Sequence, residues 1–116
     1  MGQPIVHWEI GAKDAEKLQE FYAKLFDWQI SPSGYPGYMQ VDTGQENLAG
    51  GIMQIKEDIP PYVAIYVSVD DLQTYLDKAE SMGGKTVVPP TPIPTLGSFA
   101  VFLDPEEHPI GLFQRE

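Results

Sequence analysis

The chain has 116 residues, of which 42% are hydrophobic and 11% aromatic, a composition typical of one folded domain rather than of a disordered segment. It contains no cysteine, which excludes disulfide bonds, thiolate metal ligands and a cysteine nucleophile. Its net charge of −10 disfavours nucleic acid and anionic membranes as partners, because both attract basic surfaces. No apolar run approaches the roughly 20 residues of a membrane helix and no secretory signal is recognisable, so we expect a cytoplasmic protein.

Two stretches of the sequence match each other at a nearly constant spacing, which indicates an internal repeat. Residues 6–14 form a short predicted strand that ends in an aspartate, and residues 63–71 repeat this pattern, so that Asp71 lies 57 residues after Asp14. The tetrapeptide GIMQ at 51–54 has its counterpart GLFQ at 111–114, 60 residues later. We therefore expect a single domain, residues 1–116, that contains two modules at about 4–56 and 62–115.

A helix is predicted after each aspartate, because apolar residues then recur with the 3.6-residue period of one buried stripe. Each aspartate can accept a hydrogen bond from a free amide of the first helical turn, and Gly83 with Gly84 supplies the end of the second helix. The predicted buried stripes are Ala15, Leu18, Phe21, Tyr22, Leu25 and Phe26 in the first helix, and Leu72, Tyr75, Leu76, Ala79 and Met82 in the second.

Three strands are predicted after each helix, so that each module has the order βαβββ. The prolines at 89, 90, 92 and 94 lack amide donors, which places this stretch at a sheet edge or in a loop. Residues 57–61 connect the modules. The predicted strands are Trp28–Ser31, Tyr38–Val41 and Gly50–Ile55 in the first module, and Thr86–Val88, Ser98–Leu103 and Ile110–Gln114 in the second.

Alternation along a strand determines which residues share a face. In the strand over residues 62–69, the four branched residues Val63, Ile65, Val67 and Val69 form an apolar face that the second helix is expected to cover. The opposite face then borders a cavity, and a mostly apolar cavity with a few polar groups is typical of a small-molecule site. We predict that the ligand-binding residues are His7, Glu9, Met53, Tyr62, Tyr66 and Phe113.

The order βαβββ twice, with these motifs, resembles the vicinal oxygen chelate superfamily of glyoxalases, bleomycin-resistance proteins and dioxygenases. The resemblance covers essentially the whole chain and is closest to a subgroup related to lactoylglutathione lyase. It implies an α+β fold in which the two modules form an open, curved, mixed sheet. The residues that carry it are His7-Trp8-Glu9-Ile10 with Asp14 and Phe21-Tyr22, Val69-Asp70-Asp71-Leu72, Gly83-Gly84-Lys85, and the stretches 99–106 and 110–112.

In metal-dependent members of this superfamily, four positions in the first and last strands of the two modules supply ligands to one divalent cation. By position they correspond here to His7, Gly51, Ala64 and Gly111. Glycine and alanine have no donor side chain, and a catalytic divalent site needs about three protein ligands. Glu9 could add at most a second donor. We therefore expect neither a metal nor another cofactor.

His7 and Glu9 are the candidate catalytic residues. An imidazole suits proton transfer at neutral pH, but His7 is equally consistent with a hydrogen-bonded residue of the cavity wall. Glu9 is either half-buried with a raised pKa or solvated at the mouth of the cavity. Tyr62 and Tyr66 either contact a ligand or fill the cavity.

Three further residues lie in segments rich in glycine and proline or in turns. Tyr35 and Tyr38 form either a lid or a turn. His108 precedes the last strand next to a proline, and we expect it to be an exposed loop residue.

Two functions from different classes remain open. The first is a metal-independent module that binds a small aromatic or amphipathic molecule. The second is a glyoxalase-like lyase or isomerase that uses acid–base chemistry at His7 and Glu9, or a weakly held metal. The residues Gly51, Ala64 and Gly111 favour the first. We also expect a homodimer, because a domain this small buries only about two-thirds of its unfolded surface and members of the superfamily usually pair.

Overall fold

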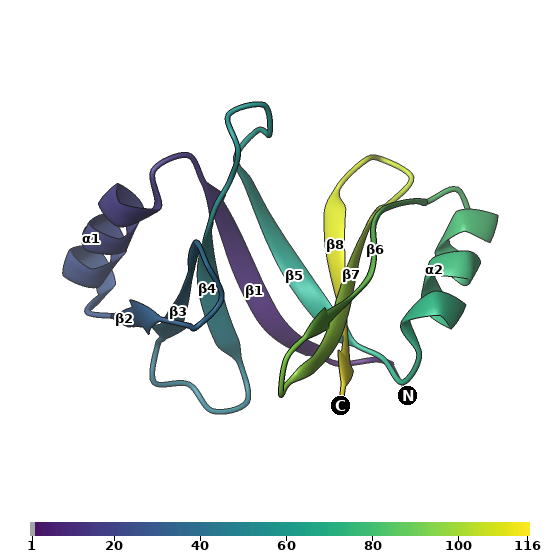
Figure 1. Ribbon diagram of the computed structural model, residues 1–116, viewed down its shortest axis with the longest axis horizontal. Helices are drawn as coiled ribbons and strands as arrows, with labels where there is room; N and C mark the ends of the chain where they lie inside the picture. The colour runs from purple at the N-terminus through teal and green to yellow at the C-terminus, as the bar shows by residue number, and fades with distance from the viewer. Residues whose placement is uncertain (1) are drawn as a thin grey trace. The chain divides into compact units, whose positions relative to one another are not determined.

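The computed structural model describes residues 2–116 and contains the order βαβββ twice within them (Figure 1). The predicted α+β class and the predicted repeat are confirmed. The first run consists of β1 (Ile5–Ala12), α1 (Ala15–Phe26), β2 (Gln29–Pro32), β3 (Tyr38–Asp42) and β4 (Ala49–Gln54). The second consists of β5 (Tyr62–Ser68), α2 (Leu72–Ser81), β6 (Lys85–Ile93), β7 (Gly97–Leu103) and β8 (Pro109–Arg115).

The chain forms two compact units, each with one helix. The N-terminal unit comprises residues 7–63 and contains α1, and the C-terminal unit comprises residues 64–116 together with residues 2–6 and contains α2. A backbone hydrogen bond of 2.9 Å from the Ser68 amide to the Pro4 carbonyl joins the first residues to the C-terminal unit. The boundaries between the units therefore fall inside β1 and β5, not in the loop at 57–61.

In the N-terminal unit the strand order is β2-β3-β4-β1. The β1 strand is parallel to β4, whereas β3 is antiparallel to both β2 and β4. One face of these strands packs against α1 around the buried residues Ala12, Ala15, Val41 and Ile52. Partly buried aromatic residues extend this core, so most of the apolar area in the unit lies between α1 and the strands.

In the C-terminal unit the strand order is β5-β8-β7-β6, with β5 parallel to β8 and the other neighbours antiparallel. Its core lies between α2 and the strands, around the buried residues Val69, Leu72, Leu76, Ala100 and Leu112. The proline-rich stretch is at the edge, as predicted, but it belongs to a strand that is longer than expected. The register of β6 shifts on both sides of Val88, where consecutive prolines follow and donate no hydrogen bonds to β7.

The predicted buried stripe of α1 is too wide. Phe21, Leu25 and Phe26 are 54%, 57% and 53% exposed, although their spacing places them beside Leu18 and Tyr22, which pack on the core. The helical period identifies the apolar side of a helix, but the width that becomes covered depends on the strands beneath it.

The predicted burial of one whole face of β5 is also wrong. Val67 and Val69 contact the core under α2, but Val63 is 71% exposed and Ile65 is 37% exposed. Because Val63 belongs to the N-terminal unit and α2 to the C-terminal unit, one helix does not cover the strand from end to end.

A glutamine from the last strand of each run caps the helix of that run. The Gln54 side-chain oxygen accepts a hydrogen bond of 2.9 Å from the Ala15 amide, and the Gln114 oxygen accepts one of 3.0 Å from the Leu72 amide. Each helix start has free amides that need an acceptor, so these two bonds fasten the helices to β4 and β8.

The aspartate before each helix behaves differently in the two runs. Asp14 accepts a hydrogen bond of 3.1 Å from the Lys17 amide, as predicted. Asp71 makes no such bond, because its carboxylate accepts a bond of 2.6 Å from the Thr74 hydroxyl instead. At the other end of α2, Gly83 has a φ of +100° and ends the helix as predicted. Neither helix within residues 2–116 is long and apolar enough to cross a membrane.

We expect that Gln54→Ala and Gln114→Ala each lower the free energy of unfolding by about 1 kcal/mol, the usual effect of losing a helix cap. Urea denaturation followed by circular dichroism measures this loss. The matched control is Gln45→Ala, which removes an exposed glutamine from the loop before β4. If all three variants have the same stability, the two caps contribute nothing to the fold.

Candidate functional site

The face of each sheet that lies opposite its helix carries the predicted site residues. In the N-terminal unit, Trp8 and Ile52 pack towards α1, so strand alternation turns Glu9 and Gly51 to the other side, where they are register partners. Met53 lies next to Tyr38 of β3 on the same face. We call this the helix-free face of the N-terminal unit.

Four polar side chains on this face form a continuous hydrogen-bonded chain. The Tyr62 hydroxyl donates to the Glu9 carboxylate at 2.5 Å, and the Tyr38 hydroxyl is hydrogen-bonded both to Glu9 and to the Nε2 atom of His7. A phenol has one hydrogen, so when Tyr38 donates it to Glu9, its oxygen accepts the Nε2 hydrogen of His7. The order is therefore His7, Tyr38, Glu9, Tyr62, with the carboxylate only 8% exposed.

Burial and the charge of Glu9 determine the protonation of this chain. Burial raises the pKa of Tyr38, and the neighbouring Glu9 charge raises it further. Burial and the hydrogen bond to Glu9 likewise raise the pKa of Tyr62. Burial lowers the pKa of His7 because it disfavours the charged imidazolium. At neutral pH both phenols and the imidazole are therefore neutral and can donate or accept hydrogen bonds.

Strand glycines allow the tyrosine rings to lie against the backbone. A Cβ atom built on Gly51 would lie 1.9 Å from the Tyr38 hydroxyl oxygen, and one built on Gly11 would lie 2.2 Å from the Tyr62 ring. In the C-terminal unit a Cβ on Gly111 would lie 2.3 Å from the Tyr66 ring. All three distances are far too short for any larger residue, so each ring occupies the space that a side chain would need.

The four positions that resemble metal-ligand positions therefore do not fit a metal. His7 offers one imidazole, Gly51 and Gly111 are covered by tyrosine rings, and Ala64 is buried without a donor. Within residues 2–116 no group of three or more His, Asp or Glu side chains is arranged to hold a metal ion. The donor set is thus insufficient for the three-ligand site that a catalytic divalent cation requires.

The structure brings His7, Glu9 and Tyr62 together on the helix-free face of the N-terminal unit and places Met53 beside them on β4. Tyr66 and Phe113 belong to the C-terminal unit, where strand alternation directs both away from α2. Tyr66 is 8% exposed.

Tyr38 is the central residue of the chain, and sequence reasoning did not include it in the site. It begins strand β3 and is neither a lid nor part of a turn. Alternation with the buried Val41 was the signal that could have placed Tyr38 opposite α1. The exposed Tyr35 does lie in the turn before β3, and His108 is exposed in the turn between β7 and β8, hydrogen-bonded to Asp104 at 3.0 Å, as predicted.

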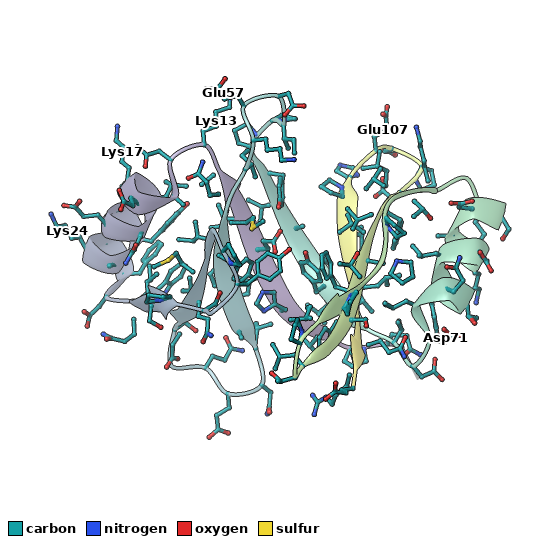
Figure 2. All side chains as sticks on the ribbon, in the orientation of Figure 1. Lys13, Lys17, Lys24, Glu57, Asp71 and Glu107 are labelled. Carbon is teal, nitrogen blue, oxygen red and sulfur yellow. The ribbon has the colours of Figure 1, made fainter. Side chains whose placement is uncertain are left out.

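The charged side chains that surround the fold point outward. Lys17 and Lys24 on α1, and Glu57 and Glu107 in loops, extend away from the strands (Figure 2). The exposed pair Lys24 and Glu20 forms an ion pair of 2.8 Å along α1. These contacts lie apart from the polar chain, which consists of one carboxylate with neutral donors.

A family model described as the Glyoxalase/Bleomycin resistance protein/Dioxygenase superfamily matches residues 4–112. The chain belongs to this superfamily. The predicted family and fold class are thereby confirmed, and the positions of His7, Gly51, Ala64 and Gly111 can be read as positions in a superfamily member.

Curated relatives are considerably longer than this chain. "Putative glyoxylase CFP32" of Mycobacterium tuberculosis is 26% identical over 113 residues, which cover 91% of this chain and 43% of the relative. "Anthracycline biosynthesis protein DnrV" of Streptomyces peucetius is 26% identical over 116 residues, which cover 84% of this chain and 42% of the relative. The chain therefore spans less than half of the length of these relatives.

Solved structures share the fold at low sequence identity. The Mn(II)-bound glyoxalase from Novosphingobium aromaticivorans has a TM-score of 0.66 at 16% identity, with 97% of this chain and 38% of that chain covered. Methylmalonyl-CoA epimerase from Mycobacterium tuberculosis has a TM-score of 0.65 at 12% identity, with 97% and 87% covered. These similarities concern the fold alone.

We expect His7 to make stability depend on pH. Its pKa in the folded protein lies below the ordinary 6.5, so the unfolded chain binds this proton more readily. The contribution of His7 to stability is therefore complete above about pH 6.5 and is lost as the pH falls towards the lowered pKa. Urea denaturation at several pH values from 8 to 5 should show a smaller loss in His7→Gln than in the unaltered protein. His108→Gln, which removes an exposed imidazole, is the control, and an unchanged pH profile in His7→Gln would contradict this assignment.

We further expect Gly51→Ala to lower the free energy of unfolding by about 1–3 kcal/mol, because the added methyl group must displace the Tyr38 ring. In a Tyr38→Ala background the same substitution should cost less, with a coupling energy on the order of 0.5–3 kcal/mol. Gly2→Ala is the control, since nothing lies within 4 Å of a Cβ at that position. Additive effects of the two substitutions would show that the ring does not depend on the glycine.

Proposed function

We propose that this chain is a metal-independent binding module for a small aromatic or amphipathic molecule, which occupies the helix-free face of the N-terminal unit. One observation carries the proposal: the Tyr38 ring fills the space above Gly51, where metal-dependent relatives would need a ligand side chain. The same arrangement recurs with Tyr66 above Gly111. Rings that cover the backbone supply flat apolar contact area in place of metal ligands.

The chemistry of the face favours a ligand that combines an apolar body with polar groups. Met53 supplies an apolar side chain beside the His7–Tyr38–Glu9–Tyr62 chain. Neutral phenols and an imidazole can hydrogen-bond to carbonyl or hydroxyl groups, and the net charge of −10 attracts cations. The name "Anthracycline biosynthesis protein" in the relatives directs the first screen to planar aromatic compounds with a basic group.

The second candidate is a glyoxalase-like lyase or isomerase, with His7 and Glu9 as the catalytic residues. The observation that favours it is the hydrogen-bonded connection from His7 through Tyr38 to Glu9, which can move a proton between an imidazole and a carboxylate. Turnover of the adduct of methylglyoxal and glutathione, measured with and without added Mn²⁺, distinguishes this function from binding. Turnover that His7→Ala and Glu9→Gln both abolish would establish the enzyme.

We expect protein purified and dialysed against buffer to contain well under one equivalent of Zn, Ni, Mn or Fe per chain, because two of the four ligand positions are glycines under tyrosine rings. Elemental analysis measures this. A fluorescent anthracycline should bind with the same affinity before and after EDTA. His7→Ala and Tyr66→Ala should each weaken that binding by roughly 1–3 kcal/mol, the usual loss for a contacting side chain. A stoichiometric metal that survives dialysis, or binding that neither variant weakens, would overturn the proposal.

We also propose that the chain forms a homodimer. The support is the exposed apolar area on α1, where Phe21, Leu25 and Phe26 are all more than half exposed. Light scattering across a hundredfold dilution should give a mass of about twice 12.9 kDa at the higher concentrations. A mass near 12.9 kDa throughout would rule the dimer out.

A further inference from the structure

The C-terminal unit contains a hollow between α2 and its strands. Its volume is about 360 Å³, within the range of roughly 300–1,000 Å³ that small-molecule pockets occupy. Ala79 and Met82 of α2 form one wall, and Phe102, Ile110 and Leu112 of β7 and β8 form the other. The hollow lies on the helix side of these strands, whereas Tyr66 and Phe113 lie on the opposite face.

The N-terminal unit has no such hollow among its described residues, because aromatic side chains fill the corresponding space. Tyr22 and Phe26 of α1 pack against Trp28, with ring centroids 5.5 Å and 5.0 Å apart, and Trp8 of β1 lies 5.3 Å from Trp28. Together these four rings form a continuous cluster between α1 and the strands, which we call the aromatic plug.

The internal repeat shows which residues replace the plug in the second run. At the spacing of 57 residues that relates Asp14 to Asp71, Tyr22 corresponds to Ala79 and Phe26 to Gly83. The counterparts of Trp8 and Trp28 are Ile65 and Lys85, so none of the four rings is retained. The spacing is structurally valid, because Gln54 and Gln114 cap the two helices at equivalent first-turn amides.

The hollow therefore lies where the repeat predicts aromatic rings and the second run supplies small or polar residues. Ala79 itself lines it, at the position equivalent to Tyr22 of the plug. The floor, formed by residues such as Phe102 and Leu112, remains apolar and packs on the core of the unit. An apolar space with one set of rings removed favours a molecule that supplies those rings.

We propose that this hollow is a binding site for a flat aromatic molecule of one or two rings, which takes the place of the missing plug. Lys78 and Asp104 also line the hollow and provide a positive and a negative group for polar substituents on the ligand. This site is separate from the one under the proposed function, and either can exist without the other.

Indole is the probe for this site, because it is flat, uncharged and has two fused rings. In a titration of the ¹⁵N-labelled protein followed by NMR, we expect saturable shifts at the amides of Ala79, Gly84, Phe102 and Leu112 and none at His7 or Glu9. Intermolecular NOEs from the indole protons to the Ala79 methyl group of the unaltered protein should locate the ring. Shifts that do not saturate up to the solubility limit of indole, or that cluster away from the hollow, would overturn the proposal.

The matched variant restores the missing ring. Ala79→Tyr should fill the hollow, raise the melting temperature and weaken indole binding at least tenfold. Asp77→Tyr is the control, since it adds the same ring at an exposed position of α2 that does not line the hollow. Ala79→Leu fills part of the space and serves if the tyrosine variant does not fold. Unchanged indole affinity in the folded filling variant would refute the site.

Discussion

The candidate site depends on one steric constraint: a tyrosine ring can lie on a strand only where the strand has no side chain. Gly51 and Gly11 meet this condition in the N-terminal unit, and the rings of Tyr38 and Tyr62 use the space. The position of the Tyr38 ring brings its hydroxyl within reach of both His7 and Glu9. Any larger residue at position 51 would displace the ring and break the polar chain, so the glycine belongs to the site although it has no functional group.

The two runs of the repeat keep the same frame but fill it differently. Both fasten their helix with a glutamine from the last strand, and both place that strand parallel to the first strand of the run. The frame is therefore maintained by backbone hydrogen bonds and two caps, which do not depend on the bulk of the packed side chains. This independence allows the first run to carry the aromatic plug and the second to carry Ala79 and a hollow.

Much of the fold could be predicted because local signals agree with it. The aspartate before each helix, the end at Gly83, the alternation in β1 and the proline-rich edge all correspond to the observed elements. The errors concern surfaces that only tertiary packing defines. Nothing in the period of α1 indicates that the strands cover Tyr22 but leave Leu25 more than half exposed.

The polar site was predictable in its strand residues and not in its connection. His7, Glu9 and Tyr62 follow from alternation alone. The role of Tyr38 depends on a ring that crosses to a glycine on the neighbouring strand, and this requires the register of β3 against β4. Pairing between strands separated by a loop is not encoded in either strand by itself.

The crossing of the chain between its two units has a consequence for the order in which it folds. Residues 2–6 emerge first during synthesis, yet their partner Ser68 follows more than sixty residues later. The C-terminal unit thus contains contacts of long sequence separation, which close slowly because a long loop must first be ordered. A cut in the loop at 57–61 would not yield two independent halves, since each fragment would carry a strand segment that belongs to the other unit.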